Sequence, residues 1–361
     1  MSTLERELTQ GKKAVSRIEL VGLIMVALSI FGLLVNPGFI AGIFNAMVER
    51  TVPVIVNVYI TGTLGVTIIL SVVTGRILER LGFTDALIRI FTPITKLMGI
   101  NPTVVIPAVY NILGDINAAG RITGPTLKRA KATKDEQKIA IATMIQSQQS
   151  FSTFMLGMLA MTAAGIKVFP VIVIAVFLPL VVVPWLLSRT IYRNTEAKSL
   201  VHIDRFTPTT GALPTLFGAA REGAELLFLL LIPAAAAIFA IIGALNYIGI
   251  WGPIEQGLTA ALTALSIDPQ TGIQSILVSP TLAMNTLKDT AATLNPKLVI
   301  GSFVLASSGF PLQVIVGQVP AIWASGSDLT EREAMEAAVL GAVMRIVTAF
   351  ILALVLTPLV S

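Results

Sequence analysis

Cysteine is absent from the 361-residue sequence, and histidine occurs once, as His202. Without cysteine there are no disulfides, iron–sulfur clusters or thiolate metal sites. A single histidine excludes the paired histidines of zinc metalloprotease motifs. The GxxxxGK[ST] loop of nucleotide-driven motors and the GxSxG motif of serine hydrolases are also missing. The sequence therefore predicts no enzyme, no resident cofactor and no bound metal.

Charged residues are scarce as well. They make up 12% of the chain, about half the usual share of a soluble domain. Hydrophobic residues make up 55%, and the mean hydropathy is +0.85. Runs such as Val168 to Ser188 and Ala337 to Val360 exceed the roughly 18 residues that cross a bilayer as a helix. We therefore expect an all-α polytopic membrane protein whose main partner is the lipid bilayer.

Lysine and arginine cluster at the N-terminus and in two predicted loops: Arg121, Lys128, Arg129, Lys131, Lys134 and Lys138 in one, and Arg189, Arg193, Lys198 and Arg205 in the other. Membrane proteins concentrate these residues on the cytoplasmic side. The pI of about 9.6 thus reflects topology, and we expect no nucleic-acid partner. The charges predict a multi-pass protein of the cytoplasmic membrane, with its N-terminus inside and its C-terminus outside.

Seven stretches are predicted to span the membrane, at 18–36, 53–75, 138–162, 168–190, 224–247, 298–323 and 337–360. Shorter, amphipathic or half-length segments lie at 38–50, 84–98, 103–118, 211–221, 253–265 and 270–286. The first span is expected to be a retained helix, because its apolar run is too long for the core of a signal peptide.

The two halves of the chain resemble each other. Residues 81–102 align without gaps to residues 248–269, although few positions are identical. Three full spans per half require the second half to be inverted, the architecture of many secondary transporters. The predicted parts are a cytoplasmic N-terminus with the first helix (1–37), a first repeat (38–197), a cytoplasmic linker (198–210) and a second, inverted repeat (211–361). Chance similarity between apolar segments is the alternative, because shared composition inflates such matches.

Matching spans of the two halves each contain a polar interruption, QSQQSFST (146–153) in one and ASSGFPLQ (306–313) in the other. Polar side chains and irregular backbone survive at membrane depth only inside protein or beside a water-filled cavity. Gly309 and Pro311 add flexibility and remove a helical hydrogen bond. We therefore expect broken helices here and re-entrant helices before them, with a solute site at the repeat interface.

Hydroxyl and amide side chains at these interruptions and on the half-length segments are the candidate substrate-binding residues: Asn117, Gln146, Ser147, Gln148, Gln149, Ser150, Thr153, Asn285, Thr286, Ser307, Ser308 and Gln313. Each serine or threonine could instead bond back to its own helix or join two helices. Asp115 and Glu222 are candidates for coupling to Na+ or H+. Asp115 could equally be the interfacial end of its segment, and Glu222 an interfacial anchor or the partner of Arg221. Arg345, inside the last span, could extend to the cytoplasm.

The segments GDINAAGRITGPTLKRA (114–130), QKIAIATMIQSQQSFSTFMLGMLA (137–160) and NTLKDTAATLNPKLVIGSFVLASSGFPLQVIVGQVP (285–320) resemble the Gate, or nucleoside-recognition-domain, membrane proteins. That family is similar to the concentrative nucleoside transporters and to the membrane domain of the ferrous-iron transporter. The resemblance implies a substrate between re-entrant half-helices and the two broken spans. This chain departs from those relatives in lacking a GTPase domain, membrane cysteines and acidic residues at the broken spans.

We therefore predict a secondary active transporter, a symporter that moves a small polar, nucleoside-like or other solute by alternating access. A non-transporting membrane scaffold, a passive channel and a metal-ion transporter are the alternatives. A homo-oligomer stays open, because Gly and Ala faces serve packing within and between subunits equally.

Overall fold

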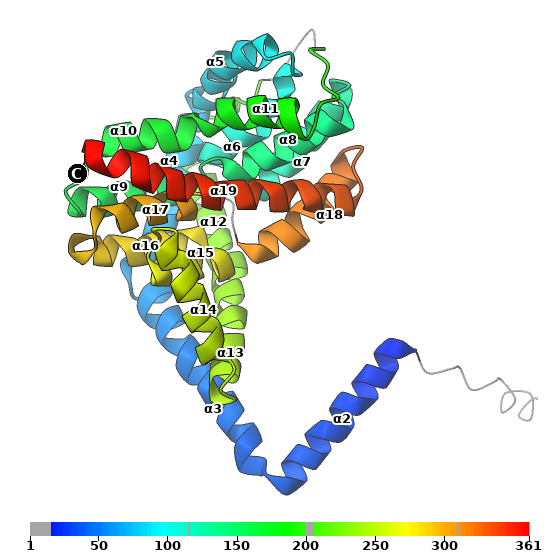
Figure 1. Cartoon of the computed structure of the whole chain (residues 1–361), viewed down its shortest axis with the longest axis vertical. Helices are drawn as coiled ribbons and strands as arrows, with labels where there is room; N and C mark the ends of the chain where they lie inside the picture. Colours follow the sequence, from blue (N-terminus) through cyan, green and yellow to red (C-terminus); the bar gives the residue numbers. More distant parts are fainter. Residues whose placement is uncertain (1–15, 115, 199–204, 309–310, 361) are drawn as a thin grey trace, which may run out of the picture.

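The computed structural model describes residues 16–114, 116–198, 205–308 and 311–360, and these residues form helices joined by short turns (Figure 1). Five helical stretches are long and apolar enough to cross a membrane: Arg17–Val35, Pro37–Ile60, Val168–Thr190, Ala212–Tyr247 and Glu331–Val360. The prediction of an all-α, multi-pass membrane protein is confirmed.

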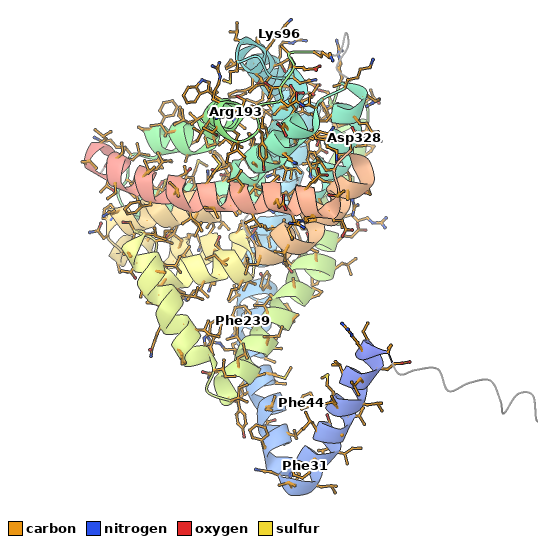
Figure 2. All side chains as sticks on the ribbon, turned by 45° about the vertical axis from the view of Figure 1, so that its right-hand side comes forward. Phe31, Phe44, Lys96, Arg193, Phe239 and Asp328 are labelled. Carbon is orange, nitrogen blue, oxygen red and sulfur yellow. The ribbon has the colours of Figure 1, made fainter. Side chains whose placement is uncertain are left out.

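The first described helix, α2 (Arg17–Val35), leaves the body of the protein (Figure 1). Ser16 caps it, because its hydroxyl accepts from Glu19 N while the Glu19 carboxylate accepts from Ser16 N. None of its residues is buried, and Figure 2 shows Phe31 on α2 away from the body of the protein and Phe44 on the stretch of α3 beside α2. Both rings are more than 60% exposed, as expected of side chains that face lipid.

Two long helical stretches lie antiparallel and form a pair that we call the long-helix pair. One is α3 (Pro37–Pro53), η1 (Val54–Ile60) and α4 (Thr63–Arg80); the other is α12 (Ala212–Glu225), η4 (Leu226–Leu231) and α13 (Ile232–Tyr247). Helix α3 packs on α13, and α12 packs on α4. The prediction of separate half-length segments at 38–50 and 211–221 is wrong, since both continue directly into the following span.

Wide π-helical turns explain how three helical stretches continue through a proline, one of them in the long-helix pair. Segments η3 (Val173–Phe177), η4 and η6 (Val314–Gln318) each end two residues before a proline, namely Pro179, Pro233 and Pro320. Proline lacks an N–H, and its ring would clash with the carbonyl four residues earlier. A π turn shifts the local hydrogen-bond register and makes room for the ring.

Each half then contains an amphipathic helix followed by a helical hairpin. In the first half these are α5 (Phe83–Leu97), then η2 (Pro102–Val105) with α6 (Ile106–Leu113), and α7 (Ile116–Arg129); in the second half they are α14 (Trp251–Ala264), α15 (Pro269–Leu277) and α16 (Pro280–Thr290). Gly82 and Gly249 precede α5 and α14 with positive φ, at the spacing of the sequence alignment. Residues 121–129, predicted as a basic loop, form the second arm of the first hairpin instead.

The two predicted broken spans are broken in the structure. Helix α8 (Lys134–Gln146) stops before α9 (Phe151–Ala163), and α17 (Pro296–Ala306) stops before η6 and α18 (Val319–Gly326). One further span follows each break: α10 (Val168–Ile172), η3 and α11 (Pro179–Thr190), and in the second half α19 (Glu331–Val360). The carboxylate of Glu136 anchors the start of α8 by accepting from Asn101 N and Thr133 N, and burial raises its pKa.

Contacts at the two ends of α19 show that the halves are inverted. At its start, Lys128 pairs with Asp328 and Lys134 with Glu333, next to the beginning of α8. Gln137 donates to Asp328, and this bond together with Lys128 lowers the pKa of that carboxyl. At the far end, Lys167 N donates to Val360 O. Helix α18 ends beside Gly124, at the end where α8 begins, so the two broken spans run in opposite directions. Which end is cytoplasmic stays a prediction from the charges.

Candidate functional site

The two helix breaks lie against each other at the centre of the protein. Gln148 and Ser308 form an isolated antiparallel bridge, and Gln149 N donates to Ser307 O over 2.8 Å. Unwound backbone in a membrane has no water to bond, so its amides and carbonyls must find partners inside the protein. Each break supplies partners for the other. No gap for a solute therefore separates the bridged residues, and any solute must bind beside them.

Side chains of the first break form a buried hydrogen-bond network. Asn111, on hairpin helix α6, donates to Met144 O over 3.3 Å and to Ser147 Oγ over 3.2 Å. Gln148 Nε2 donates to Thr153 Oγ1 over 2.5 Å. Four amide oxygens of this region have no hydrogen-bond partner: Asn111 Oδ1, Gln146 Oε1, Gln148 Oε1 and Gln149 Oε1. One amide nitrogen, Gln146 Nε2, has none either. Such unsatisfied buried acceptors are uncommon in native proteins, and they mark this break as a place for a missing donor or cation.

A cavity of about 270 Å³ lies beside the breaks, between the hairpin tips and the long-helix pair. Its lining residues come from five regions: Ser71, Val72 and Arg76 of α4; Leu113 and Gly114 of the first hairpin tip; Gln149, Ser150, Phe151 and Ser152 of the first break; Glu222, Glu225, Leu226, Leu230 and Leu231 of the α12–α13 stretch; and Ser279, Pro280 and Thr281 of the second hairpin tip. We call this space the central cavity. Its volume lies near the lower end of the ~300–1,000 Å³ of small-molecule sites.

Two helix N-termini meet at one wall of the central cavity. Helix α9 begins after Ser150, and helix α16 begins after Ser279. Ser152 Oγ and Thr281 Oγ1, in the first turns of these helices, lie 3.5 Å apart. Helix N-termini carry partial positive charge and free N–H groups, and hydroxyls both donate and accept. This wall is therefore suited to the electronegative, hydrogen-bonding edge of a solute.

The long-helix pair contributes an ion pair to the lining of the central cavity. Arg76 donates to both carboxylate oxygens of Glu222, from Nε over 2.9 Å and from Nη2 over 2.6 Å. Nη1 also donates to Glu79 over 2.5 Å and to Tyr110 Oη of the first hairpin over 3.4 Å. Arg76 and Glu222 line a second cavity too, of about 560 Å³, which lies beside residues 205–210 of the linker. The ion pair thus stands at the boundary between the two cavities.

The substrate-binding and ion-coupling residues predicted from the sequence lie in several different parts of the structure. Gln149, Ser150 and Glu222 line the central cavity, whereas Gln146, Ser147, Gln148, Thr153, Ser307 and Ser308 are fully buried behind it. Asn117 donates to Gln318 of the second broken span over 2.9 Å. Asn285 bonds only weakly to Asp289, and Gln313 is half-buried. Asp115 lies outside the described residues.

Thr286 lines a different cavity from the central cavity. It donates to Gln274 over 2.7 Å, and both residues line a third cavity of about 330 Å³ with Glu49 and Arg50 of α3. Two alternatives for charged residues are wrong. Glu222 pairs with Arg76 rather than with Arg221, which binds Glu225. Arg345 is fully buried and does not extend to the cytoplasm.

Several lining residues are absent from the sequence-based candidates. Ser279 and Thr281 flank Pro280, and the sequence does show this polar step inside an apolar segment, although neither residue is among the candidates above. Ser71 and Arg76 gave no comparable signal. They lie on a helix whose other residues suit a membrane span, and only the fold turns that side of α4 toward the hairpins.

The backbone of Ser150 gives a testable consequence of the break. Its φ of 58° and ψ of 149° belong to a region that glycine occupies readily and other residues at a cost of about 1–3 kcal/mol. Ser150→Gly should therefore raise the free energy of unfolding by about 1 kcal/mol, seen as a higher Tm in detergent. The matched control, Ser325→Gly at an exposed position of helix α18, should instead lower the free energy of unfolding by about 0.5 kcal/mol. A Tm for Ser150→Gly below that of the parent would contradict the assigned backbone conformation.

Comparison with known proteins gives matches at the level of structure alone. No protein-family model and no curated protein matches the sequence. Among solved structures, CNTnw, a concentrative nucleoside transporter, in an inward-facing substrate-bound state is similar with a TM-score of 0.59 and 14% sequence identity, over 94% of this chain and 86% of that one. The chain has the fold of a concentrative nucleoside transporter. Two variants of CNTnw in an outward-facing state are similar with TM-scores of 0.57 at the same identity and coverage.

Proposed function

We propose that the protein is an ion-coupled secondary transporter of a small polar solute, related to the Gate membrane proteins. The observation that carries this proposal is the central cavity, which both hairpin tips, a helix break and the long-helix pair enclose together. Movement of the hairpins relative to the long-helix pair would open such a cavity to one side of the membrane and then to the other.

The chemistry of the walls favours a solute of the nucleoside type. Hydroxyls of Ser150, Ser152 and Thr281 and the amide of Gln149 can each donate and accept, which suits neutral polar groups. The ring of Phe151 adds an apolar surface on which a flat ring can pack. The described residues hold no group of three His, Cys, Asp or Glu side chains that could bind a metal ion, so a metal-ion cargo is less well supported.

A sodium ion is the coupling ion that the first break suits best. Its four amide oxygens without partners lie at the end of half-helix α8, where the helix dipole is negative. Unwound helix ends of this kind bind coupling ions in secondary transporters. Glu222 is a weaker candidate than the sequence indicated, because Arg76 already balances its charge. Asp115 remains a candidate on sequence grounds.

Transport in liposomes tests the proposal. Purified protein should accumulate uridine or adenosine above equilibrium under an inward sodium gradient. Thr281→Val keeps the shape of the residue but removes a hydroxyl from the cavity wall. Since one hydrogen bond contributes about 0.5–1.5 kcal/mol, its KM should rise about 3- to 10-fold while its Tm stays unchanged.

Thr348→Val on α19 is the matched control, because this hydroxyl bonds only to the carbonyl of Met344 on its own helix. Uptake that reaches equilibrium and never exceeds it would favour a channel. A folded protein that moves no nucleoside, amino acid or divalent metal under sodium or proton gradients would favour a scaffold and overturn the transport proposal.

A further inference from the structure

Arg345 is the largest charged group in the protein interior that the transport proposal leaves unused. It lies near the middle of α19 and is 0% exposed. No carboxylate of the described residues lies within 4.0 Å of its guanidinium, since it takes part in no ion pair. A buried cation without an acid is costly, so the groups that surround it must supply the compensating negative potential.

Those groups belong to the second helix break. Arg345 Nε donates to Val304 O over 2.7 Å, and Nη2 donates to Ser307 Oγ over 2.7 Å. Nη1 reaches Ala175 O over 3.4 Å. Helix α17 ends at Ala306, so Val304 O is one of the last carbonyls of this half-helix, which carry its partial negative charge. The guanidinium is thus held by the end of a helix dipole.

The first break has the same construction with a different partner. Ser147 Oγ donates to Met144 O, three residues earlier, as Ser307 Oγ donates to Val304 O. At the first break the group that meets this carbonyl and hydroxyl is the neutral amide of Asn111. Counted from the end of its helix, the counterpart of Asn111 in the second hairpin is Ser275, whose hydroxyl has no partner. The second hairpin therefore makes no such contact with the second break through Ser275, and Arg345 contacts the carbonyl and hydroxyl of that break instead.

The charge balance of the two breaks differs as a result. The first break combines a helix C-terminus, neutral amides, four acceptors without partners and one donor without a partner, Gln146 Nε2, so it holds no full positive charge. At the second break, the guanidinium of Arg345 places a full positive charge at the equivalent carbonyl and hydroxyl, and the Arg345 side chain ties this charge to α19. We propose that Arg345 is a tethered cation, which permanently occupies the position that an exchangeable cation would otherwise fill at the second break. This rests on the proposed ion coupling and limits exchange to the first break.

Three substitutions separate charge from shape. Arg345→Gln replaces the guanidinium by a neutral amide, so the second break comes to resemble the first. Arg345→Lys keeps a tethered positive charge, and Arg345→Met fills the space with apolar atoms. Thr348→Ala, one turn further along α19, is the control for changes in this helix. The measurement is the Tm of the full chain in detergent as NaCl or KCl replaces choline chloride at constant ionic strength.

A cation that binds only the folded protein raises the Tm with its concentration. Arg345→Gln should gain a saturable rise of about 5 °C between ~1 and ~100 mM cation, beyond the response of the parent. Arg345→Lys and Thr348→Ala should respond as the parent does. Arg345→Met should have the lowest Tm in choline and no added response, because it offers neither charge nor space.

An unchanged cation response of Arg345→Gln, or an equal gain in Arg345→Lys, would overturn the proposal. If Arg345→Gln does not fold, the comparison of the other two variants decides: a tethered charge requires a higher Tm for Arg345→Lys than for Arg345→Met, and equal values contradict it. This readout is independent of transport. A protein that moves no solute but shows the added response would refute the proposed function and leave the tethered cation standing.

Discussion

Gly301→Val is expected to leave little or no folded protein. A Cβ on Gly301 would lie 2.0 Å from Ser266 O and 3.0 Å from Ser266 C, and both are backbone atoms. The turn that holds Ser266 cannot move away easily, since Asp268 N donates to Ser302 Oγ over 2.8 Å and Ser266 itself has a φ of 60°. Overpacking of a rigid contact costs about 1–3 kcal/mol and occasionally more, and a backbone collision belongs at the upper end. Yield of monodisperse protein and Tm are the measurements.

Gly257→Val provides the comparison for that substitution. Gly257 also lies in a helix, α14, but no atom comes within 4 Å of a Cβ built there. Valine and glycine differ little in helix propensity, so this variant should keep the yield and Tm of the parent within about 0.5 kcal/mol. A Gly301→Val protein as stable as Gly257→Val would show that α17 and the turn at Ser266 do not touch as described.

Glu222→Arg should reduce uptake at least 10-fold without unfolding the protein. The change places a second guanidinium against Arg76, whose side chain is 23% exposed, and removes the bidentate partner that holds it. Two like charges at a half-buried site repel, so Arg76 should turn into one of the two cavities that it lines. Concentrative uptake and Tm in detergent, measured on the same preparation, separate loss of transport from loss of folding.

The double variant Arg76→Glu with Glu222→Arg, in which the two charges are exchanged, tests whether the residues act as a pair. It restores an ion pair across α4 and α12 with the same groups exchanged, and it should recover more uptake than either single variant. Arg76→Glu alone should be at least as impaired as Glu222→Arg, because it faces both Glu79 and Glu222. A swapped protein no better than the worse single variant would mean that these residues act on the solute individually rather than as a pair.

Sequence reasoning located the features that depend on local polarity. A membrane helix with Gln146 to Thr153 at its centre has no stable way to remain continuous in lipid, so the break could be placed within a few residues. The gapless alignment of the two halves likewise placed α5 and α14 at equivalent positions. These signals lie in the residues themselves and need no knowledge of the neighbours.

The remaining errors come from contacts between distant segments. Residues 121–129 looked like a cytoplasmic loop because of their lysines and arginines, yet α7 packs on α18, and this contact makes them the arm of a hairpin. Arg345 looked like a residue near the interface, but its partners come from α17 and η3, far away along the chain. Arg76 acquires a role only when α12 brings Glu222 beside it. No window of the sequence contains such information.

The bridge between Gln148 and Ser308 consists of main-chain groups, and this has a consequence for how far the sequence around it can change. Any residue other than proline supplies both an amide and a carbonyl. The central junction of the molecule therefore places little constraint on the identity of the side chains around it. Mutation can therefore replace nearly all of them while the two halves stay joined. A shared fold at 14% identity is compatible with such a junction. The positions where the helices end have to be kept, whereas the residues between these positions can change.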